Sequence, residues 1–400
     1  MESSSSIMNL NVQSGSNLVD AMAAIDEGIT KVGLTFYPHL FQTNTSITKR
    51  RQDGTMSRKR SRPDEPTEAV GSLPNLQEIT CSGGMAVHSL HVSSLTAILT
   101  NRQDSNLQSL CLSRIQLLGH AEDFDEFSEC LQNQHQLRVF HLVDCKIAAA
   151  ASGDGSSPRR KQRRHNNAAP PSFSINTILQ AVASLPSVES IQVTSKQQLF
   201  CGLGVLTPAT LETLCWSTTL KRLVLKGFIL NAQHVYSMGP GIATSQSLQS
   251  VVLHKLGDTS NAQGKVNDCL TYMLQDNTSL EHFELPAMTG GTSPRWVQMA
   301  STVLQKNTKL RVLHLGGPQQ QQPQPNNTTS TTEAWNSVQF HLKLNAAGRS
   351  RLLGQQQQNN DSMALSSNRE WVHVIGNVAD DLDCVFYFLS RNPSLCGRQL

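Results

Sequence analysis

The sequence has few aromatic residues and lacks the patterns that define several common protein classes. Aromatic residues make up 5% of the 400 residues and hydrophobic residues 38%, which is little for one large compact core. No stretch reaches the eighteen consecutive apolar residues that a membrane helix needs, and the Ser- and Asn-rich start lacks the apolar core of a signal peptide. We therefore expect an intracellular protein, in the cytoplasm or nucleus, that has no contact with a membrane.

The cysteines form no recognisable framework. The nine cysteines are scattered, and no two of them make a C-x-x-C pair. Several fall at positions expected to face a core, where a free cysteine behaves as a small apolar side chain. This pattern is typical of reduced thiols in an intracellular protein and does not indicate disulfides.

Motifs that would indicate catalysis are also missing. Gly202-Leu203-Gly204 is followed by neither the later glycine nor the lysine of a phosphate loop, and the sequence has no H-E-x-x-H and no G-x-S-x-G. The acidic residues Asp380, Asp381 and Asp383 flank an apolar stripe and are interpreted as a solvated helix face. We expect a protein that is not an enzyme and that binds no cofactor and no metal.

Basic residues are concentrated in two short runs. The net charge is +3, but outside the runs acidic residues outnumber basic ones. A run ending at Pro63 is typical of a nuclear import signal, and residues 159–164 form a second candidate; a charged linker that no receptor reads is the alternative. Neither run contains interleaved aromatics, which argues against nucleic acid as a partner. The residues of the candidate import signal are Lys49, Arg50, Arg51, Arg58, Lys59, Arg60 and Arg62.

A repeated L-x-x-L-x-L pattern organises most of the chain. Residues 280–285 and 310–315 are two clear copies, and apolar residues alternate in each, as expected of a strand with one buried face. Successive copies begin 28 to 32 residues apart, except for one interval of 51 that contains a basic insertion. The copies begin at Leu76, Leu107, Leu137, Val188, Leu220, Leu248, Leu280 and Leu310.

Helical patterns lie between these strands. The clearest has Trp296, Met299, Ala300, Val303 and Leu304 on one stripe, after an expected N-cap and first-turn proline at residues 293–294. Similar stripes begin at residues 175, 208 and 266. Residues 231–246 have lost this periodicity and contain Pro240, so we expect a shorter or broken element there.

The ends of the chain have other patterns. Residues 1–17 are Ser- and Asn-rich and are predicted to be disordered; a weak helix pattern follows at 18–25 and a strand-like one at 32–41. Residues 337–348 predict a ninth strand, with either Phe340 and Leu342 or Leu342 and Leu344 facing inward. Residues 371–389 keep a helical period and predict one long capping helix.

These patterns give a domain map. Residues 1–70 are expected to be mostly disordered and to hold the basic run 49–63. Residues 71–347 form the repeat array, with loop insertions at about 148–173 and 317–335. Residues 348–369 are a polar Gln- and Asn-rich loop, and 370–400 are the capping helix and tail.

The repeats resemble the leucine-rich repeat family, of the long ribonuclease-inhibitor-like subtype. The resemblance rests on eight L-x-x-L-x-L copies in register over residues 73–347, although the asparagine or cysteine usual after the strand is mostly missing and Cys145 is one match. It implies an α/β solenoid, a horseshoe with a parallel sheet on its concave side and helices on its convex side. The C-terminal segment also resembles the end unit of repeat proteins from microalgae, which implies no chemistry.

The concave sheet is the predicted working surface. The residue between the last two leucines of each strand points away from the core, and the residue two positions later shares that face. We predict a monomer with a non-catalytic scaffold function, in which another protein binds this face and Val224 and Val252 form an exposed apolar patch. Regulation of a GTPase or other enzyme, and a nuclear role with nucleic acid, are the alternatives. The residues expected to contact the partner are His141, Gln192, Val224, Lys226, Val252, His254, Glu284 and His314.

A shared metal was also considered for this face. His141 and His314 lie on strands five apart, which at about 4.8 Å per strand places them about 24 Å from each other. This distance excludes a common metal ion for that pair.

Overall fold

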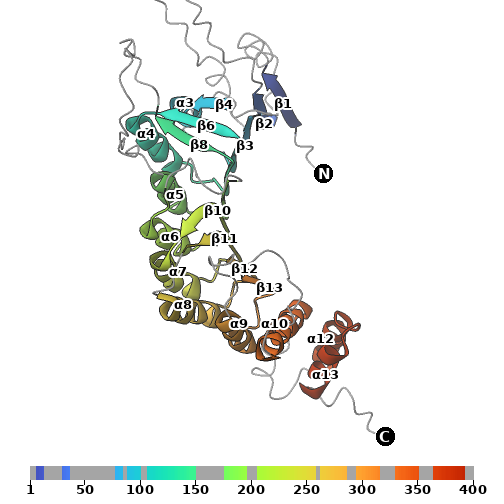
Figure 1. The fold of residues 1–400 in the computed structure, drawn as a ribbon. Coiled ribbons are helices and arrows are strands. Elements are labelled where there is room, and N and C mark those ends of the chain that lie inside the picture. Colours follow the sequence, from blue (N-terminus) through green and yellow to red (C-terminus); the bar gives the residue numbers. More distant parts are fainter. Residues whose placement is uncertain are drawn as a thin grey trace, which may run out of the picture. The chain divides into compact units, whose positions relative to one another are not determined.

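The protein is an α/β repeat structure of the leucine-rich-repeat type, with parallel strands flanked by helices (Figure 1). Its chain contacts define two compact units, Met1–Leu214 and Cys215–Leu400, called here the N-terminal and C-terminal units. The computed structural model describes residues 6–12, 29–36, 77–83, 88–100, 106–149, 175–195, 205–257, 262–285, 294–315, 329–350 and 364–391.

The N-terminal unit contains a parallel sheet whose strands follow chain order. Its hydrogen-bonded pairs are all in parallel register. Within β5 and β7 the inward residues are 0–1% exposed and the residues between them are half-buried. The alternation expected from the sequence is therefore confirmed here. The strands are β1 (Ser6–Val12), β2 (Ile29–Phe36), β3 (Glu78–Gly83), β5 (Ser109–Ser113), β7 (Val139–Val143) and β9 (Ser190–Thr194).

A second, three-stranded parallel sheet in this unit was not predicted. It consists of β4 (His88–His91), β6 (Ile115–Gly119) and β8 (Lys146–Ala149). β6 follows β5, and β8 follows β7, through turns at Arg114 (φ 56°) and Asp144 (φ 54°). The left-handed region is unfavourable for residues other than glycine. Both turns are held by backbone hydrogen bonds, from Arg114 N to Val143 O (2.8 Å) and from Asp144 N to Thr194 O (2.7 Å).

Helices alternate with these strands along the chain. Asn176 of α5 connects its helix to the segment before α6, since its Nδ2 donates to Val205 O and its Oδ1 accepts from Thr207 N, both at 2.9 Å. The Thr207 hydroxyl in turn accepts from Thr210 N in the first turn of α6. The helices are α3 (Val92–Thr100), α4 (Ala121–Gln132), α5 (Ile175–Ala183) and α6 (Pro208–Cys215), which ends at the boundary between the units.

The C-terminal unit repeats the strand-and-helix arrangement, with helices on one side of the strands and the other sheet face turned away from them (Figure 1). We call the latter the helix-free face. The strands pair in parallel and in chain order. At Gly227 (φ 111°) the backbone takes a conformation that favours glycine, where the register of β10 shifts. The elements are β10 (Arg222–Leu230), α7 (Ala232–Thr244), β11 (Ser250–Leu256), α8 (Gln263–Asp276), β12 (His282–Leu285), α9 (Pro294–Lys306) and β13 (Val312–Leu315).

Helix α7 corrects the expectation of a broken element around Pro240. The helix has 13 residues and contains that proline. The Asn231 side chain accepts from His234 N, and the His234 ring reaches back to Asn231 N at 3.1 Å. Val235, Met238 and Ile242 are completely buried. Capping and burial together offset the loss of one backbone hydrogen bond at proline, about 3 kcal/mol in an unsupported helix.

Three buried asparagines join successive repeats of this unit. Asn307 Nδ2 donates to Leu274 O (2.6 Å) and Asn277 O (3.1 Å), and its Oδ1 accepts from the amides of Lys309 and Leu310 (both 2.8 Å). Asn277 makes the corresponding bonds one repeat earlier. Asn345 Nδ2 donates to Asn307 O and Leu310 O one repeat later. Each amide thus satisfies backbone groups that a turn would otherwise bury without partners.

The predicted ninth strand is wrong, because residues 329–347 form helix α10 (Thr329–Ala347). Val338, Leu342 and Asn345 are buried at helical spacing, and Ser301 of α9 donates to Ser337 of α10 at 2.8 Å. The alternation at residues 340–344 spans too few residues to distinguish the two periods. This helix also occupies the end of the predicted 317–335 loop, as β8 occupies the start of the 148–173 loop.

The predicted single capping helix is two helices, α12 (Ala364–Gly376) and α13 (Leu382–Arg391). α13 begins after Asp381, whose carboxylate accepts from Cys384 N. Gly376 ends the first helix, and Asp381 caps the second, so Asp381 has a structural role beyond the expected solvated face. The helices share a core with α10, formed by Leu344, Ala347, Trp371, Val374, Val378, Cys384 and Phe388.

Arg349 fixes this end of the unit to α9. Arg349 is 6% exposed, and its guanidinium donates to Leu304 O (3.1 Å) and Gln305 O (2.7 Å), two of the last carbonyls of α9. The guanidinium also lies over the Tyr387 ring, 5.8 Å from its centroid. A buried cation therefore satisfies the carbonyls that a helix leaves without partners at its C-terminus.

The first 41 residues contain two described strands, β1 and β2. Residues 6–12, predicted to be disordered, form β1, whose Met8, Leu10 and Val12 alternate along a strand paired with β2. The strand-like pattern at 32–41 is confirmed as far as Phe36. The helix pattern at 18–25 and the N-cap at 293 lie outside the described residues. No helix of the described part of the chain is long and apolar enough to cross a bilayer.

Candidate functional site

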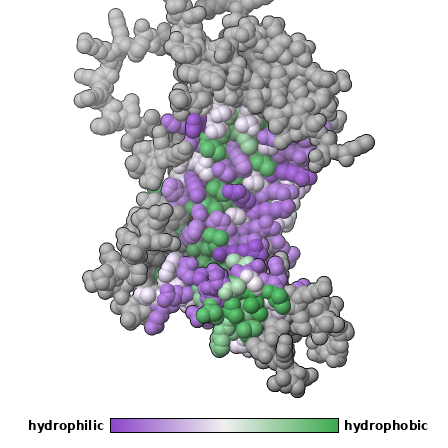
Figure 2. Space-filling view, turned by 90° about the vertical axis from the view of Figure 1, so that its right-hand side faces the viewer, coloured by the Kyte–Doolittle hydropathy of each residue, from purple (hydrophilic) through white to green (hydrophobic). Residues whose placement is uncertain are grey.

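The helix-free face of β10 to β13 places the predicted contact residues in one row. Val224 lies beside Val252, Val252 beside Glu284, and Glu284 beside His314 in the parallel register. Lys226 and His254 follow two positions later on β10 and β11. Figure 2, turned toward the side on which these strands lie in Figure 1, shows hydrophilic residues beside a band of hydrophobic ones over the coloured middle of the surface. The predicted row is present in the structure.

The expected exposed apolar patch within this row is wrong. Val224 is 4% exposed and Val252 is 5% exposed. Lys226 of β10 forms an ion pair with Glu284 of β12, and this pair crosses β11 on the face from which Val252 projects. The exposed side chains that flank the valines in this row, such as Lys226 and His314, are polar or charged.

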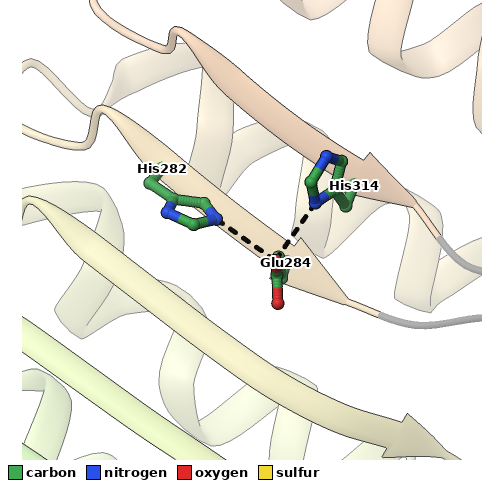
Figure 3. Close-up of side chains that lie close together, drawn as sticks. All are labelled: His282, Glu284 and His314. Atoms are coloured by element: carbon green, nitrogen blue, oxygen red, sulfur yellow. Dashed lines mark hydrogen bonds and ion pairs between the residues drawn. The ribbon is translucent and has the colours of Figure 1, made fainter.

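Glu284 is the centre of a cluster of charged and ionisable groups (Figure 3). Its Oε2 lies 3.4 Å from Lys226 Nζ. Its Oε1 lies 3.1 Å from His314 Nδ1 and 3.4 Å from His282 Nε2. The two histidine rings meet edge to face, with centroids 6.2 Å apart. His282 and Glu284 share β12 and His314 projects from β13, so all three stand on one side of the sheet.

The charge of Glu284 is stabilised by these neighbours. Partial burial raises the pKa of its carboxyl, but the hydrogen bond from His314 and the charge of Lys226 outweigh burial and hold the pKa of Glu284 below its ordinary value. The carboxylate is therefore ionised at neutral pH. Its side chain is 23% exposed, whereas those of Lys226 and His314 are 47% and 67% exposed, so both ion pairs are partly screened by solvent.

His282 is a member of the cluster that the sequence analysis missed. Its Nε2 is buried and, among the described residues, takes part in no hydrogen bond, because the 3.4 Å contact with Glu284 is an ion-pair contact only. The signal was present in the sequence as His282-x-Glu284, two residues on the same face of one strand, with His314 in register on the next. It was overlooked because the predicted row on this strand began at Glu284, two residues after His282.

The N-terminal unit has a similar row with different chemistry. Cys111 lies beside His141, and His141 beside Gln192. The His141 ring lies 3.8 Å from Cys111 Sγ through Nδ1 and 3.1 Å from Ser190 Oγ through Nε2. This histidine contacts a thiol and a hydroxyl.

The described cysteines are free thiols, and several are protonated by burial. Burial raises the pKa of Cys81 and Cys215 to about 12 and that of Cys145 to about 11. A thiol with such a pKa is a poor nucleophile and metal ligand at neutral pH. Cys145 instead donates to Leu112 O and Val143 O, the structural position that the sequence resemblance assigned to it.

The candidate import residues 49–62 and the second basic run at 159–164 lie outside the described residues. Their function remains a prediction from the sequence.

Comparisons with known proteins identify no family. The sequence matches no protein-family model and no curated protein. The structure is similar to the leucine-rich repeat-containing protein LegL7 from Legionella pneumophila, with 13% identity, a TM-score of 0.35, and coverage of 84% of this chain and 98% of that one.

Two further similar structures cover less of the chain. Leiomodin-1 actin-binding site 2 has 12% identity and a TM-score of 0.32 over 46% of this chain and 95% of that one. The tropomodulin C-terminal domain of Caenorhabditis elegans has 11% identity and a TM-score of 0.29 over 42% and 89%. At this level of similarity, the functional argument rests on the chain's own residues.

Proposed function

We propose that the protein is a non-catalytic scaffold that binds another protein on the helix-free face of β10 to β13. The observation that carries this proposal is the separation of roles along each strand. Inward residues such as Leu223, Leu253 and Phe283 are completely buried, while Lys226 and His314 on the opposite face keep about half or more of their side chains exposed. Outward side chains that are free of packing roles can contact a partner and vary without loss of the fold.

The contact surface in this proposal is polar rather than apolar. Its hydrogen-bonding and charged groups come from Lys226, His254, Glu284 and His314. Val224 and Val252 in the same row are buried. Such a surface selects a partner by complementary charge.

The α-helices of 13 or 14 residues between the strands of this unit also support the ribonuclease-inhibitor-like subtype. No described residue favours nucleic acid or a GTPase as the partner.

The test compares two matched triple variants. Lys226→Ser, His254→Ser and His314→Ser alter the helix-free face. Lys265→Ser, Asp268→Ser and Lys306→Ser alter exposed positions of α8 and α9. Partners captured by the tagged full chain from its native cell are identified by mass spectrometry, and each is then tested with purified protein.

We expect the first triple variant to lose a partner that the second retains, with both variants melting within about 2 °C of the wild type. Equal capture by both variants would exclude this face. Loss of capture only in the α8 and α9 variant would place the interface on the helices instead.

We further propose that the protein is intracellular and that residues 49–62 direct it to the nucleus. A large fluorescent reporter carrying residues 45–66 is compared with a version in which all seven basic residues are alanine. Nuclear accumulation of the first alone supports the proposal, and equal cytoplasmic distribution leaves the linker interpretation.

A further inference from the structure

Three side chains with metal-binding atoms meet on the helix-free face at β12 and β13. His282, Glu284 and His314 each offer one ligand atom, and these three atoms lie within 4.8 Å of one another. The contacts that share Glu284 Oε1 measure 3.1 and 3.4 Å. Figure 3 shows both rings directed toward the carboxylate, one from the same strand and one from the next.

The two distances from Glu284 to the histidines are close to those of a tetrahedral zinc site. Zinc binds imidazole nitrogen and carboxylate oxygen at about 2.0 to 2.2 Å, so neighbouring ligand atoms of a tetrahedron lie about 3.3 to 3.5 Å apart. The two measured contacts are within about 0.2 Å of that range. A donor set of two imidazoles and one carboxylate suits zinc and related transition metals, whereas magnesium and calcium prefer oxygen ligands.

We propose that His282 Nε2, Glu284 Oε1 and His314 Nδ1 bind one Zn²⁺ ion and leave its fourth position open. Three protein ligands with an open position are typical of zinc that binds a further group. Here that group is water, or a side chain of a bound protein, since the position faces away from the core. The proposal does not depend on partner capture, so either of the two proposals can fail without the other.

The hydrogen-bonding state of His282 supports this assignment independently of distance. Its Nε2 is buried and has no hydrogen-bond partner among the described residues. A buried polar atom without a partner is unfavourable by about 1 to 3 kcal/mol, and a metal ion would satisfy it. His314 is by contrast mostly exposed, which provides an open side for the ion and its fourth ligand.

Lys226 provides a sharper test, because it competes for the same carboxylate. Its Nζ contacts Oε2 at 3.4 Å and leaves Oε1 to the two histidines. The ammonium charge lowers the affinity of a nearby cation without being a ligand. Its removal is therefore expected to tighten zinc binding, the opposite of the effect of removing a ligand.

The experiment measures Zn²⁺ binding to the chelator-stripped full chain by calorimetry in a non-thiol reductant. We expect one equivalent to be lost, or its affinity to fall at least about tenfold, in each of His282→Ala, Glu284→Gln and His314→Ala. Lys226→Met is expected to bind zinc about two- to fivefold more tightly. The control His141→Ala, which changes a histidine of the N-terminal unit that contacts Cys111 and Ser190, should match the wild type.

A second measurement separates this site from the cysteines and from misfolding. Co²⁺ bound here gives the weak visible bands of a nitrogen and oxygen site without a thiolate charge-transfer band. Zinc should also raise the melting temperature of the wild type and not that of His314→Ala, a change at an exposed position that leaves the metal-free melt intact.

Four results would overturn the proposal. These are no zinc binding by the wild type, wild-type binding by the His282→Ala and His314→Ala double variant, a thiolate spectrum with cobalt, and weaker binding in Lys226→Met.

Discussion

The helix-free rows of the two units carry different chemistry on the same backbone pattern. In the N-terminal unit, His141 lies between the thiol of Cys111 and the hydroxyl of Ser190, and the neighbouring outward residue is the neutral Gln192. In the C-terminal unit, one carboxylate gathers an ammonium group and two imidazoles. Neutral neighbours satisfy one another locally, whereas an ionised cluster can also attract charged groups from outside. The binding proposals therefore concern the C-terminal unit.

The units also differ in the polar groups that join their repeats. In the C-terminal unit, Asn277, Asn307 and Asn345 connect backbone groups of successive repeats. The N-terminal unit uses the amide of Asn176 in the same way, but it also uses the thiol of Cys145, which makes long sulfur contacts of 3.3 and 3.6 Å with two carbonyls. An amide both donates and accepts, while a thiol is a weak donor. We therefore expect the asparagine contacts between repeats, called here asparagine joints, to contribute more to the free energy of unfolding than the contacts of Cys145.

The largest expected effect is that of Asn307→Ala. The substitution leaves two carbonyls and two amides without their partner at a position 3% exposed. We expect the free energy of unfolding to fall by about 3 to 5 kcal/mol. Cys145→Ala should lower it by only about 1 kcal/mol. Urea denaturation of both variants measures the difference; equal losses would show that the two kinds of joint are equivalent.

Val224→Arg tests the difference between the outward rows. Because Val224 is 4% exposed, the guanidinium must displace its neighbours or remain partly buried. We expect a loss of about 2 to 3 kcal/mol, reduced by the ability of a long side chain to reach solvent. Gln192→Arg at the half-buried position of the N-terminal unit should change stability by less than about 1 kcal/mol. If Val224→Arg left the free energy of unfolding unchanged, Val224 would be exposed, as the sequence predicted.

The sequence predicted the strands of both units better than their polar contacts. All eight L-x-x-L-x-L copies are strands, from β3 to β13, because a leucine pattern of period two records directly which side chains are buried. The second sheet was missed since its strands have only four or five residues. α10 was assigned as a strand because Phe340, Leu342 and Leu344 alternate within a longer helical stripe.

The contacts of the candidate site could not be predicted from the pattern of single strands, because most of them join side chains of different strands. Glu284 and His314 were predicted on the correct face, but the partnership with His282 depends on which atoms reach Oε1. Val252 is buried, and an ion pair between the two neighbouring strands crosses its strand. Neither follows from one strand considered alone. The asparagines were overlooked for a similar reason, since they precede the strands and bond to the previous repeat.

Arg349→Lys tests the contact between Arg349 and the C-terminal end of α9, where a guanidinium, not an asparagine amide, donates to the backbone. Lysine keeps the charge but lacks the planar fork that donates to Leu304 O and Gln305 O. We expect a loss of about 1 to 2 kcal/mol, measured by urea denaturation. Lys306→Arg at the exposed end of α9 is the control and should be neutral. No loss in Arg349→Lys would mean that charge alone is sufficient at this contact.

The smallest expected effect concerns the exposed pair of Lys343 and Asp381, the surface counterpart of the buried joints. Lys343 Nζ lies 2.6 Å from Asp381 Oδ2. The hydrogen bond from Lys343, and then that from Cys384 N, lower the pKa of Asp381 from its ordinary 3.8, while the bond to Asp381 raises the pKa of Lys343 from its ordinary 10.5.

The two shifts limit the pH range in which the pair stabilises the fold. Because the pKa of Asp381 is lowered, its contribution to stability is present above about pH 3.8 and is lost as the pH falls through the pKa of the folded state. Because the pKa of Lys343 is raised, its contribution is present below about pH 10.5 and is lost as the pH rises through the pKa of the folded state. Lys343→Gln should therefore melt slightly below the wild type from pH 5 to 9, and the difference should vanish in acid. Added salt should also reduce it, because solvent screens an exposed pair. A difference that persists at pH 2 would mean that Lys343 acts through packing, as the buried joints do, and not through its charge.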